Sequence, residues 1–535
     1  MQRIASLVDV NSQEFRLNEL HNRRLAAELK ERQRAVRFDR PERDRERLRR
    51  QNKHFVRDRV EALLDPETPF LELSTLAANE AYNGGVPSAA QVVGIGIVAG
   101  REVIVHADDP SVKGGAWYPL SVKKIVRSLD IAIENRLPVV HLCDCGGGFL
   151  PLQAELFADR HHAGRIFRNQ SILSKMGVPQ VALVMGHCIA GGAFVPALSE
   201  YNIIVQGSGA IFLGGPSVVK VATGQHVSVD ELGGADMQTS VSGTADCIAD
   251  SEMHAIAIAR DLVGRINRPE KVSIDRVAPE PPAYDASELY GIIPRDPRVH
   301  FDMREILARL VDGSRFHEYQ PLYGRTLVCG FARLHGYQIG VLANNGVLFD
   351  DSALKGAHFI QLCDMNRTPL LFLQNITGFM VGSEYERRGI TKNAAKLLMA
   401  VSGAAVPKFT VICNHSHGGG TFAMAGRAFD PRFLFTWPQA QISAMGADQA
   451  TQVLTDVKAK QLAADGRRLS AQEYEVTRQS ILEEYRERSS AYYATSEIWD
   501  DGILDPVDTR NALAIAMSAS LNAPIETPHY GIFRM

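Results

Sequence analysis

The sequence lacks the features that mark several large classes of protein. No apolar run approaches the roughly 20 residues that a membrane-spanning helix needs, and the first residues contain no long apolar core of the kind found in secretory signals. The net charge is only -3 over 535 residues, so charge gives no sign of a nucleic-acid or anionic-membrane partner. We therefore expect a protein that acts without nucleic acid and without a membrane.

Cysteine is scarce. The seven cysteines are odd in number, and most lie in or beside apolar stretches. This pattern favours buried thiols in a reducing compartment over a disulfide framework. The pair Cys143-x-Cys145 has the wrong spacing for the common zinc pair and no matching second pair, so no metal is expected on this chain. Because no leader is apparent, we expect a bacterial cytoplasm, or the mitochondrial matrix if the source is eukaryotic.

The side-chain motifs of the common catalytic classes are missing as well. The chain contains no Gly-x-Ser-x-Gly elbow, no P-loop and no His-Glu-x-x-His. Three histidines, His187, His415 and His417, do lie near glycine turns. A histidine in such a place is more often a packing or hydrogen-bonding residue than a general base. The polar groups available for catalysis are therefore mainly backbone N–H groups.

What the sequence does contain is a short glycine motif between an apolar strand and a helix start. Ala190-Gly191-Gly192-Ala193 follows the apolar run 180–185 and precedes a plausible helix from Phe194. A strand that passes through two glycines into a helix leaves free N–H groups at the helix N-terminus. Such a turn can bind an anion or an oxyanion.

The motif recurs in the second half of the chain. Gly418-Gly419-Gly420-Thr421 follows the apolar run 408–412, and one common offset relates Gly191 to Gly419 and Gly192 to Gly420. Such a long period indicates duplicated domains and not a short-repeat solenoid. We expect an α/β protein of two homologous domains, each with one backbone N–H site.

A proline-rich stretch supplies the boundary between the two domains. Five prolines lie between residues 276 and 312, which is the best candidate for a linker. We place an N-terminal domain at 1–290 and a C-terminal domain at 291–535. Residues 12–64 are charge-dense and helical in pattern. Because acidic and basic residues interleave there, a solvated or subunit-packing face is favoured over a nucleic-acid tail.

Each glycine motif has a second glycine loop one helix ahead of it. Asp144-Cys145-Gly146-Gly147-Gly148 ends the strand 139–143, and the loop 374–382 follows the strand 370–373. Neighbouring strand ends of a parallel sheet lie at one edge, so two such loops can direct N–H groups at one ligand atom. For one loop, glycine is explained by a tight turn. Four loops at paired positions favour a function, namely stabilising negative charge on an oxygen such as a thioester enolate.

These motifs resemble the carboxyltransferase β subunit of biotin-dependent acyl-CoA carboxylases, in the crotonase superfamily. The resemblance runs from about residue 54 to the end of the chain and is closest to the 3-methylcrotonyl-CoA and geranyl-CoA carboxylase branch. It implies two duplicated crotonase-like (ClpP/crotonase) ββα-spiral domains. The motifs that carry it are Lys113-Gly-Gly, Ala190-Gly-Gly-Ala-Phe-Val-Pro-Ala197, Gly233-Gly-Ala-Asp236, Leu371-Phe-Leu-Gln-Asn-Ile-Thr-Gly-Phe-Met-Val-Gly382, Gly426-Arg-Ala428, Pro431-Arg-Phe433, Trp499-Asp-Asp-Gly502, Ala523-Pro-Ile-Glu526 and Gly531-Ile-Phe-Arg-Met535.

The resemblance implies a reaction and assigns residues to it. The chain would transfer CO2 from carboxybiotin to the enolate of an acyl-CoA, with 3-methylcrotonyl-CoA, an intermediate of leucine catabolism, giving 3-methylglutaconyl-CoA. Gly191 and Gly192 would hold the enolate oxygen and Gly419 and Gly420 the biotin ureido oxygen, while the biotin ring nitrogen takes the proton. Other substrate contacts would come from Lys113, Gly114, Gly147, Gly148, Phe167, Arg168, Ala190 and Ala193, and biotin contacts from Thr377, Gly378, Phe379, Gly418 and Thr421.

The resemblance also implies partners. The chain has neither a Met-Lys-Met carrier motif nor an ATP-binding glycine loop, so it cannot charge biotin alone. It would need an α subunit with biotin carboxylase and biotin carrier parts. In this family the site forms between the N-terminal domain of one β subunit and the C-terminal domain of another, and the expected assembly is a β hexamer within an α6β6 complex.

Departures from the family pattern leave the acyl group open. Residues 417–424 and 144–149 differ from the usual methylcrotonyl sequences, and Arg168 stands where phenylalanine is usual, on a helix that borders the acyl pocket in this family. Arg168 must therefore turn outward or alter specificity. The alternatives are a geranyl-CoA, propionyl-CoA or other acyl-CoA carboxylase β subunit, a hydratase or isomerase acting alone, and a non-catalytic β-like subunit. The duplicated domain argues against the hydratase, and the intact glycine pairs argue against the non-catalytic subunit.

Overall fold

Two apolar hairpins occupy corresponding places in the two halves of the chain. In the computed structural model, which describes residues 2–267, 270–467 and 469–535, β3 (Gln91–Val98) and β4 (Arg101–Asp108) form the first hairpin, and β12 (Leu327–Leu334) and β13 (Tyr337–Asn344) form the second. Both hairpins are antiparallel. A glycine with a positive φ stands at each turn, Gly100 in the first hairpin and Gly336 in the second.

Each hairpin leads into parallel strands, which read as unbroken apolar runs because both faces of the sheet are covered. The first sheet has the order β10-β8-β6-β5-β4-β3-β2. Apart from its hairpin, it consists of β2 (Leu71–Leu73), β5 (Val139–Cys143), β6 (Gln180–Val184), β8 (Tyr201–Val205) and β10 (Cys247–Ala249).

The second sheet repeats this plan with the order β1-β11-β12-β13-β14-β15-β16. Its parallel part, β13 to β16, matches β4, β5, β6 and β8 of the first sheet. The structure thus confirms the duplicated α/β fold. The remaining strands are β1 (Gln2–Arg3), β11 (Arg315–Tyr319), β14 (Leu370–Ile376), β15 (Lys408–His417), β16 (Phe433–Thr436) and β17 (Gln441–Ser443), the last paired with the end of β15.

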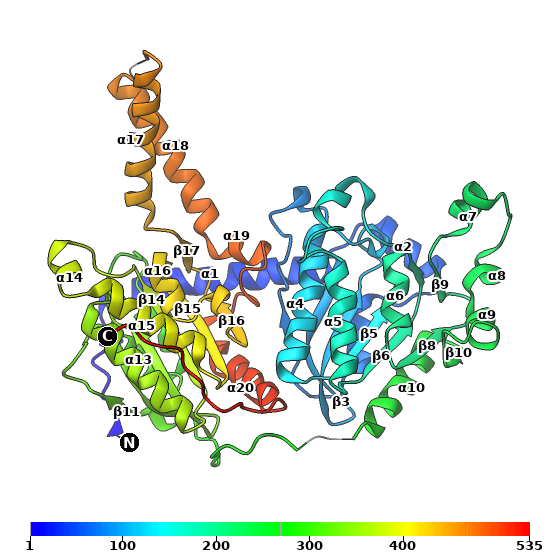
Figure 1. The fold of residues 1–535 in the computed structure, drawn as a ribbon, viewed down its shortest axis with the longest axis horizontal. Coiled ribbons are helices and arrows are strands. Elements are labelled where there is room, and N and C mark those ends of the chain that lie inside the picture. Colours follow the sequence, from blue (N-terminus) through cyan, green and yellow to red (C-terminus); the bar gives the residue numbers. More distant parts are fainter. Residues whose placement is uncertain (1, 268–269, 468) are drawn as a thin grey trace.

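Helices flank both sheets (Figure 1). In the first half they are α4 (Pro119–Asn135), α5 (Gly164–Lys175), α6 (Gly191–Ala197), α7 (Pro216–Thr223), α8 (Val229–Gly233), α9 (Ala235–Ser240) and α10 (Glu252–Arg265). In the second half they are α13 (Asp350–Met365), α14 (Ser383–Arg387), α15 (Ile390–Gly403), α16 (Gly418–Ala423), α17 (Ala447–Ala464), α18 (Ala471–Ser489), α19 (Ala491–Ser496) and α20 (Thr509–Ser520). Helices α17 and α18 form a hairpin that projects from the body (Figure 1).

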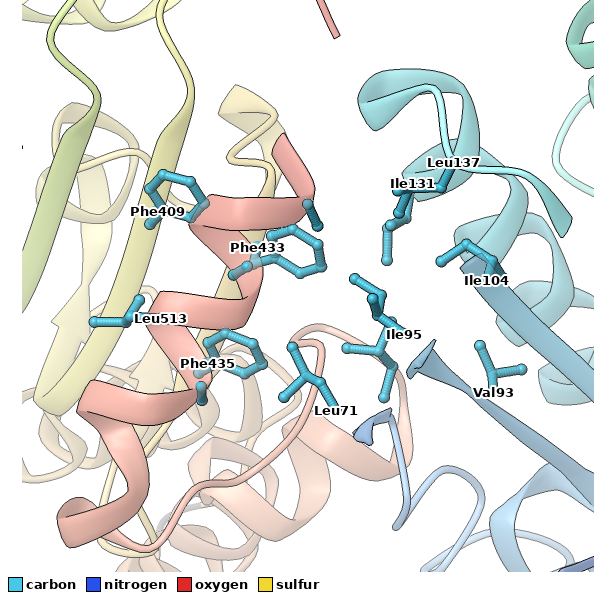
Figure 2. Close-up of a cluster of buried hydrophobic side chains, with 14 of the residues drawn as sticks. Leu71, Val93, Ile95, Ile104, Ile131, Leu137, Phe409, Phe433, Phe435 and Leu513 are labelled. Carbon is cyan, nitrogen blue, oxygen red and sulfur yellow. The ribbon is translucent and has the colours of Figure 1, made fainter. Parts of the chain in front are cut away.

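The two halves share one hydrophobic core. Phe433 and Phe435 of the second sheet lie opposite Ile95 of the first, with Leu71 beside them and Leu513 of α20 behind (Figure 2). All five side chains are buried, so separating the halves would expose apolar surface at a cost of about 25 cal/mol per Å². The halves are therefore held in one fixed arrangement.

The N-terminal helices bind to both halves. Helix α1 (Gln13–Phe38) packs on α11 (Leu289–Ile292), where Asn22 donates to the carbonyls of Tyr290 and Ile293. Near its other end, Arg37 pairs with Glu72 of β2. Two shorter helices, α2 (Glu42–Arg50) and α3 (Val56–Leu63), follow. Residues 12–64 are thus largely helical, as predicted, and α1 packs against other elements of this chain.

The proline-rich stretch that we take as the candidate linker contains buried helices. Helix α11 and α12 (Met303–Ala308) lie within it, and both are buried. Proline and glycine marked the turns correctly, but the short apolar pieces between them are too brief to show helical periodicity. The division of the chain at residue 290 stays a prediction. Among the described residues, no helix is long and apolar enough to cross a membrane.

Candidate functional site: two matching backbone N–H turns

The first glycine motif forms the expected turn at the start of α6. Strand β7 (His187–Ile189) leads to Ala190, whose φ of 53° and ψ of −117° are unusual for a residue with a side chain. The Ala190 N–H donates to the carbonyl of Phe212, and the Ala193 N–H donates to the Ala190 carbonyl. In the described part of the chain, the N–H groups of Gly191 and Gly192 have no partner. These two donors are free to bind an anionic oxygen.

The loop 144–148 packs directly against this turn. The Ile189 N–H donates to the Cys145 carbonyl at 3.2 Å, and a Cβ placed on Gly192 would lie 2.9 Å from the Cys145 Sγ. The Gly147 N–H is directed at the same sulfur, at 3.3 Å, whereas the Gly148 N–H has no partner within the described residues. The structure therefore places the 144–148 loop against the Gly191 turn and leaves the Gly148 donor open.

The Lys113 loop closes the other side of the 144–148 loop. Lys113, Gly114 and Gly115 all have left-handed φ values, between 50° and 71°. A Cβ on Gly115 would lie 2.1 Å from the Asp144 carbonyl oxygen, so only glycine fits there. The Lys113 side chain is exposed, at the edge of a cavity of about 660 Å³ that is also lined by Arg40, Arg43, Arg47 and Arg50. Because Asp39 and Asp44 are the acidic residues in the same lining, basic side chains predominate in this groove.

A buried aspartate holds these loops together, and the sequence analysis missed it. Asp108, at the end of β4, accepts the Asp144 N–H at 3.0 Å, the Gln91 amide at 2.8 Å and the Trp117 indole N–H at 3.4 Å. Burial raises the pKa of Asp108 to about 6. The sequence feature that could have revealed it is the position of Asp108, a charged residue at the end of a largely apolar strand.

A second hidden group lies beneath the same loop. The Asp144 carboxylate forms ion pairs with Lys53 at 2.8 Å and with Arg59 at 3.2 Å. Arg59 also forms an ion pair with Glu252 at 2.6 Å. All four side chains are largely buried. Such a network fixes the loop because each buried charge needs its partner. Lys53, Arg59 and Glu252 are far apart in sequence, so no local pattern could join them.

Aromatic rings line the Gly191 turn. A Cβ on Gly191 would lie 3.5 Å from the Phe167 ring and 3.7 Å from Trp117, and Phe167 contacts Phe194 with ring centroids 5.3 Å apart. Phe194 remains 42% exposed. Arg168 follows Phe167 on α5 but is exposed. The Arg168 side chain is therefore not buried with Phe167 beside the turn, and its effect on acyl specificity stays a prediction.

The second turn repeats the first at the start of α16. The N–H groups of Gly419 and Gly420 have no partner in the described residues. A Cβ on Gly420 would lie 2.4 Å from Ile376 and 3.3 Å from the Cα of Gly378, and one on Gly419 would lie 3.7 Å from the Phe379 ring. The loop 377–379 and the turn therefore meet as predicted. Thr421 accepts the Ser416 hydroxyl and so braces the turn from within.

The three histidines near the glycine turns all contact other protein groups. His415 and His417 lie beneath the second turn, bonded to each other at 3.1 Å. Burial lowers the pKa of both rings, that of His417 to about 4. His187 is exposed and packs on the Phe212 ring. Hydrogen bonding and packing account for all three. All seven cysteines are free, and the described residues contain no cluster of three or more His, Cys, Asp or Glu that could hold a metal.

Each of the two duplicated halves has an N–H turn after the third of its parallel strands. This fold defines a class of acyl- and carboxyl-transfer proteins. Residues 47–531 match the carboxyl transferase domain family, and the chain belongs to this family. It is 49% identical over 514 residues to the biotin-dependent 3-methylcrotonyl-coenzyme A carboxylase beta1 subunit of Mycobacterium tuberculosis, covering 96% of this chain and 97% of the relative.

Two further relatives agree. The methylcrotonoyl-CoA carboxylase beta chain, mitochondrial, of Dictyostelium discoideum is 46% identical, over 99% of this chain and 90% of its own length. The crystal structure of the P. aeruginosa geranyl-CoA carboxylase beta subunit superposes with a TM-score of 0.89 at 37% identity, covering 99% of both chains. The chain is thus a carboxyltransferase β subunit with the crotonase-like fold.

Proposed function

We propose that this chain carries out the carboxyl-transfer step of a biotin-dependent 3-methylcrotonyl-CoA carboxylase. The observation that carries the proposal is the pair of matching turns, each with two adjacent open N–H groups, at Gly191–Gly192 and Gly419–Gly420. The relatives at 49% and 46% identity are named as methylcrotonyl-CoA carboxylases, which supports the choice of acyl group.

The acyl thioester fits the first turn. The Gly191 and Gly192 N–H groups would hold the enolate oxygen, with the Gly148 N–H beside them, and would lower the energy of the enolate as charge develops. Phe167 and Trp117 would pack on the acyl chain. The basic groove at Lys113 would bind the phosphates of coenzyme A.

The second turn fits a planar ureido group. The Phe379 ring beside Gly419 offers a flat apolar face. Because Ile376 and Gly378 pack closely against Gly420, only the side of the turn that carries the N–H groups is open to a ligand. When bound there on its carrier, carboxybiotin supplies CO2 and a ring nitrogen that accepts the substrate proton. The Gly419 and Gly420 N–H groups would stabilise the negative ureido oxygen, Phe379 would orient the ring, and Thr377, Gly418 and Thr421 would shape the turn around it.

The proposed site needs a second copy of the chain. Helices α6 and α16, which carry the two turns, lie in separate halves of the molecule (Figure 1). Carboxyl transfer requires the two ligands to meet. We therefore assign the first turn of one subunit and the second turn of its neighbour to one site, in a β hexamer of an α6β6 complex whose α subunit carries biotin. The free thiols suit a reducing compartment, either a bacterial cytoplasm or a mitochondrial matrix.

A second acyl group has support of its own. Phe194 leaves apolar surface exposed beyond Phe167, which a longer chain would cover, and the solved neighbour at TM-score 0.89 is named for geranyl-CoA. Geranyl-CoA is therefore the alternative substrate.

The test is ATP- and bicarbonate-dependent carboxylation by this chain co-expressed with its α subunit. 3-Methylcrotonyl-, geranyl-, propionyl- and acetyl-CoA are compared by kcat/KM. Preference for 3-methylcrotonyl-CoA supports the proposal, and preference for geranyl-CoA selects the alternative. If a demonstrably carboxylated α subunit gives no turnover with any of the four, the chain is a non-catalytic subunit.

A further inference from the structure

His417 lies directly before the second turn and has no role in the proposed chemistry. It is the last residue of β15 and the N-cap of α16, so its backbone leads straight into Gly418, whose φ is +57°. The His417 side chain is only 2% exposed. It therefore cannot touch a ligand, and its imidazole faces the protein interior behind the turn.

The hydrogen-bond partners of the two histidines fix their protonation pattern. The His415 Nε2 lies 2.8 Å from the Pro297 carbonyl, which can only accept. His415 therefore carries its hydrogen on Nε2, and its Nδ1 accepts from the His417 Nε2–H at 3.1 Å. The neutral His417 then has a free acceptor at Nδ1, which lies 2.9 Å from the Ser443 hydroxyl.

The network continues from Ser443 into the projecting helical hairpin. Ser443 ends β17, and its hydroxyl lies 2.7 Å from the Met445 carbonyl, to which the Tyr485 hydroxyl of α18 also donates at 2.9 Å. The Met445 N–H donates back to the Tyr485 oxygen at 3.3 Å. The contacts thus run from Pro297 through His415, His417 and Ser443 to α18, and the one Ser443 hydroxyl hydrogen serves either the His417 Nδ1 or the Met445 carbonyl at a time.

Ser443 also borders the turn through the backbone. Strand β17 pairs in parallel with the end of β15, placing Ser443 opposite His417. The next carbonyl, that of Ala444, lies 3.0 Å from where a Cβ on Gly418 would stand. A shift of Ser443 therefore moves the wall against which the turn rests.

The surroundings favour neutral rings. Among the described residues, the groups that face His417 are the His415 ring, the Ser443 hydroxyl and the Ser416 backbone, and no carboxylate hydrogen-bonds to either ring. Burial, and then the neighbouring His415, lower the pKa of His417. The pair is therefore neutral near pH 7, as the hydrogen assignments above require.

We propose that His417 is a positioning residue for the biotin side of the reaction, holding the Gly419 and Gly420 donors in place through His415 and Ser443 and linking them to the hairpin α17–α18. This inference rests on the proposed function. Displacement of a reacting group by about 1 Å can cost about 100-fold in rate. Loss of the network should therefore weaken the use of biotin and leave acyl-CoA binding intact.

The test uses the reverse half-reaction on the β assembly, transfer of the carboxyl group from the carboxylated acyl-CoA product to free biotin. His417→Phe keeps a ring but removes both hydrogen bonds. We expect the KM for biotin to rise about tenfold, because a tenfold change corresponds to the loss of about 1.4 kcal/mol of hydrogen bonding. The KM for the CoA substrate should stay within about twofold of that of wild type.

Graded variants separate positioning from general damage. His417→Gln can still donate to His415 and should recover most of the biotin KM. Ser443→Ala removes one link with little change in volume and should raise the biotin KM in the same direction, and Tyr485→Phe should do so less. The matched control is His226→Gln, at an exposed histidine outside both turns, which should behave as wild type. Thermal unfolding of each variant shows whether it folds.

Three results decide the matter. A biotin KM unchanged in folded His417→Phe and in Ser443→Ala overturns the inference. Equal losses in both KM values overturn it too, because they indicate a purely structural role. If wild type itself transfers no carboxyl group between any of the four CoA products and biotin, the proposed function fails, and the inference falls with it for a different and recognisable reason.

Discussion

The Cα of Gly192 faces the thiol of Cys145, so that a methyl group on Gly192 would lie 2.9 Å from the Cys145 Sγ and 3.1 Å from its Cβ. Gly192→Ala should therefore push the turn away from the 144–148 loop and spoil the first N–H pair. We expect carboxylation to fall about 100-fold or more, as for loss of an oxyanion donor. Gly164→Ala, with nothing within 4 Å of the new methyl, is the control. Full activity of Gly192→Ala would remove this turn from the mechanism.

The second turn is sterically tighter. A methyl group on Gly420 would lie 2.4 Å from the Ile376 side chain. Gly420→Ala should abolish transfer to free biotin by displacing the donors, a loss of about 100-fold or more, while the Kd for acyl-CoA stays near that of wild type. Gly446→Ala has open space around its Cβ position and serves as the control. Biotin turnover at the wild-type rate in Gly420→Ala would contradict the assignment.

The basic groove predicts a salt-dependent binding step. Arg50 and Lys113 line this groove and have exposed side chains. Replacing either by alanine should raise the KM for acyl-CoA by about three- to tenfold at low salt without changing kcat, because charge-assisted contacts to phosphate are lost. The increase should shrink at high ionic strength. Arg16→Ala, at an exposed arginine on α1, is the control; an equal rise there would show a nonspecific charge effect.

One buried ion cluster joins the two halves. Asp501 pairs with Arg127 of α4 at 2.8 Å and with Arg427 of the second half at 3.0 Å, and it is fully buried. Burial alone would raise the pKa of Asp501, but the two arginines outweigh it and hold the pKa below its usual range. Asp501→Asn should destabilise the chain by about 3 kcal/mol or more, because two guanidinium groups lose their counter-charge. Urea unfolding measures this, with the exposed Asp465→Asn as a control.

Stability should depend on pH through His417. Its pKa falls from 6.5 to about 4 on burial, so the folded chain binds fewer protons there than the unfolded chain between these values. Stability from this residue is therefore lost as the pH falls from 6.5 through 4. The unfolding free energy of wild type relative to His417→Phe should drop by about 3 kcal/mol between pH 7 and pH 4. Parallel pH curves for the two proteins would contradict the buried, neutral state.

The repeat and the turns were predictable because they depend on local chemistry. Gly191 and Gly419 each follow an apolar run and precede a helix, and the common offset exposes the duplication. The exposure of Arg168 was not predictable, because one helical turn exposes some positions and buries others, and the sequence gives only the spacing. Asp108 was missed for a similar reason. Its three partners, Gln91, Trp117 and the Asp144 N–H, meet only once strands and loops are packed.

The sequence by itself determined the duplicated α/β plan, the two glycine turns and the family, because strand, turn and helix signals act over a few residues. Only the tertiary structure decided that α11 and α12 are buried, that Lys53 and Arg59 hold Asp144 beneath the loop, and that the two turns lie in separate halves. Burial and ion pairing between distant segments depend on how the whole chain packs. No short stretch of sequence contains both partners of such a contact.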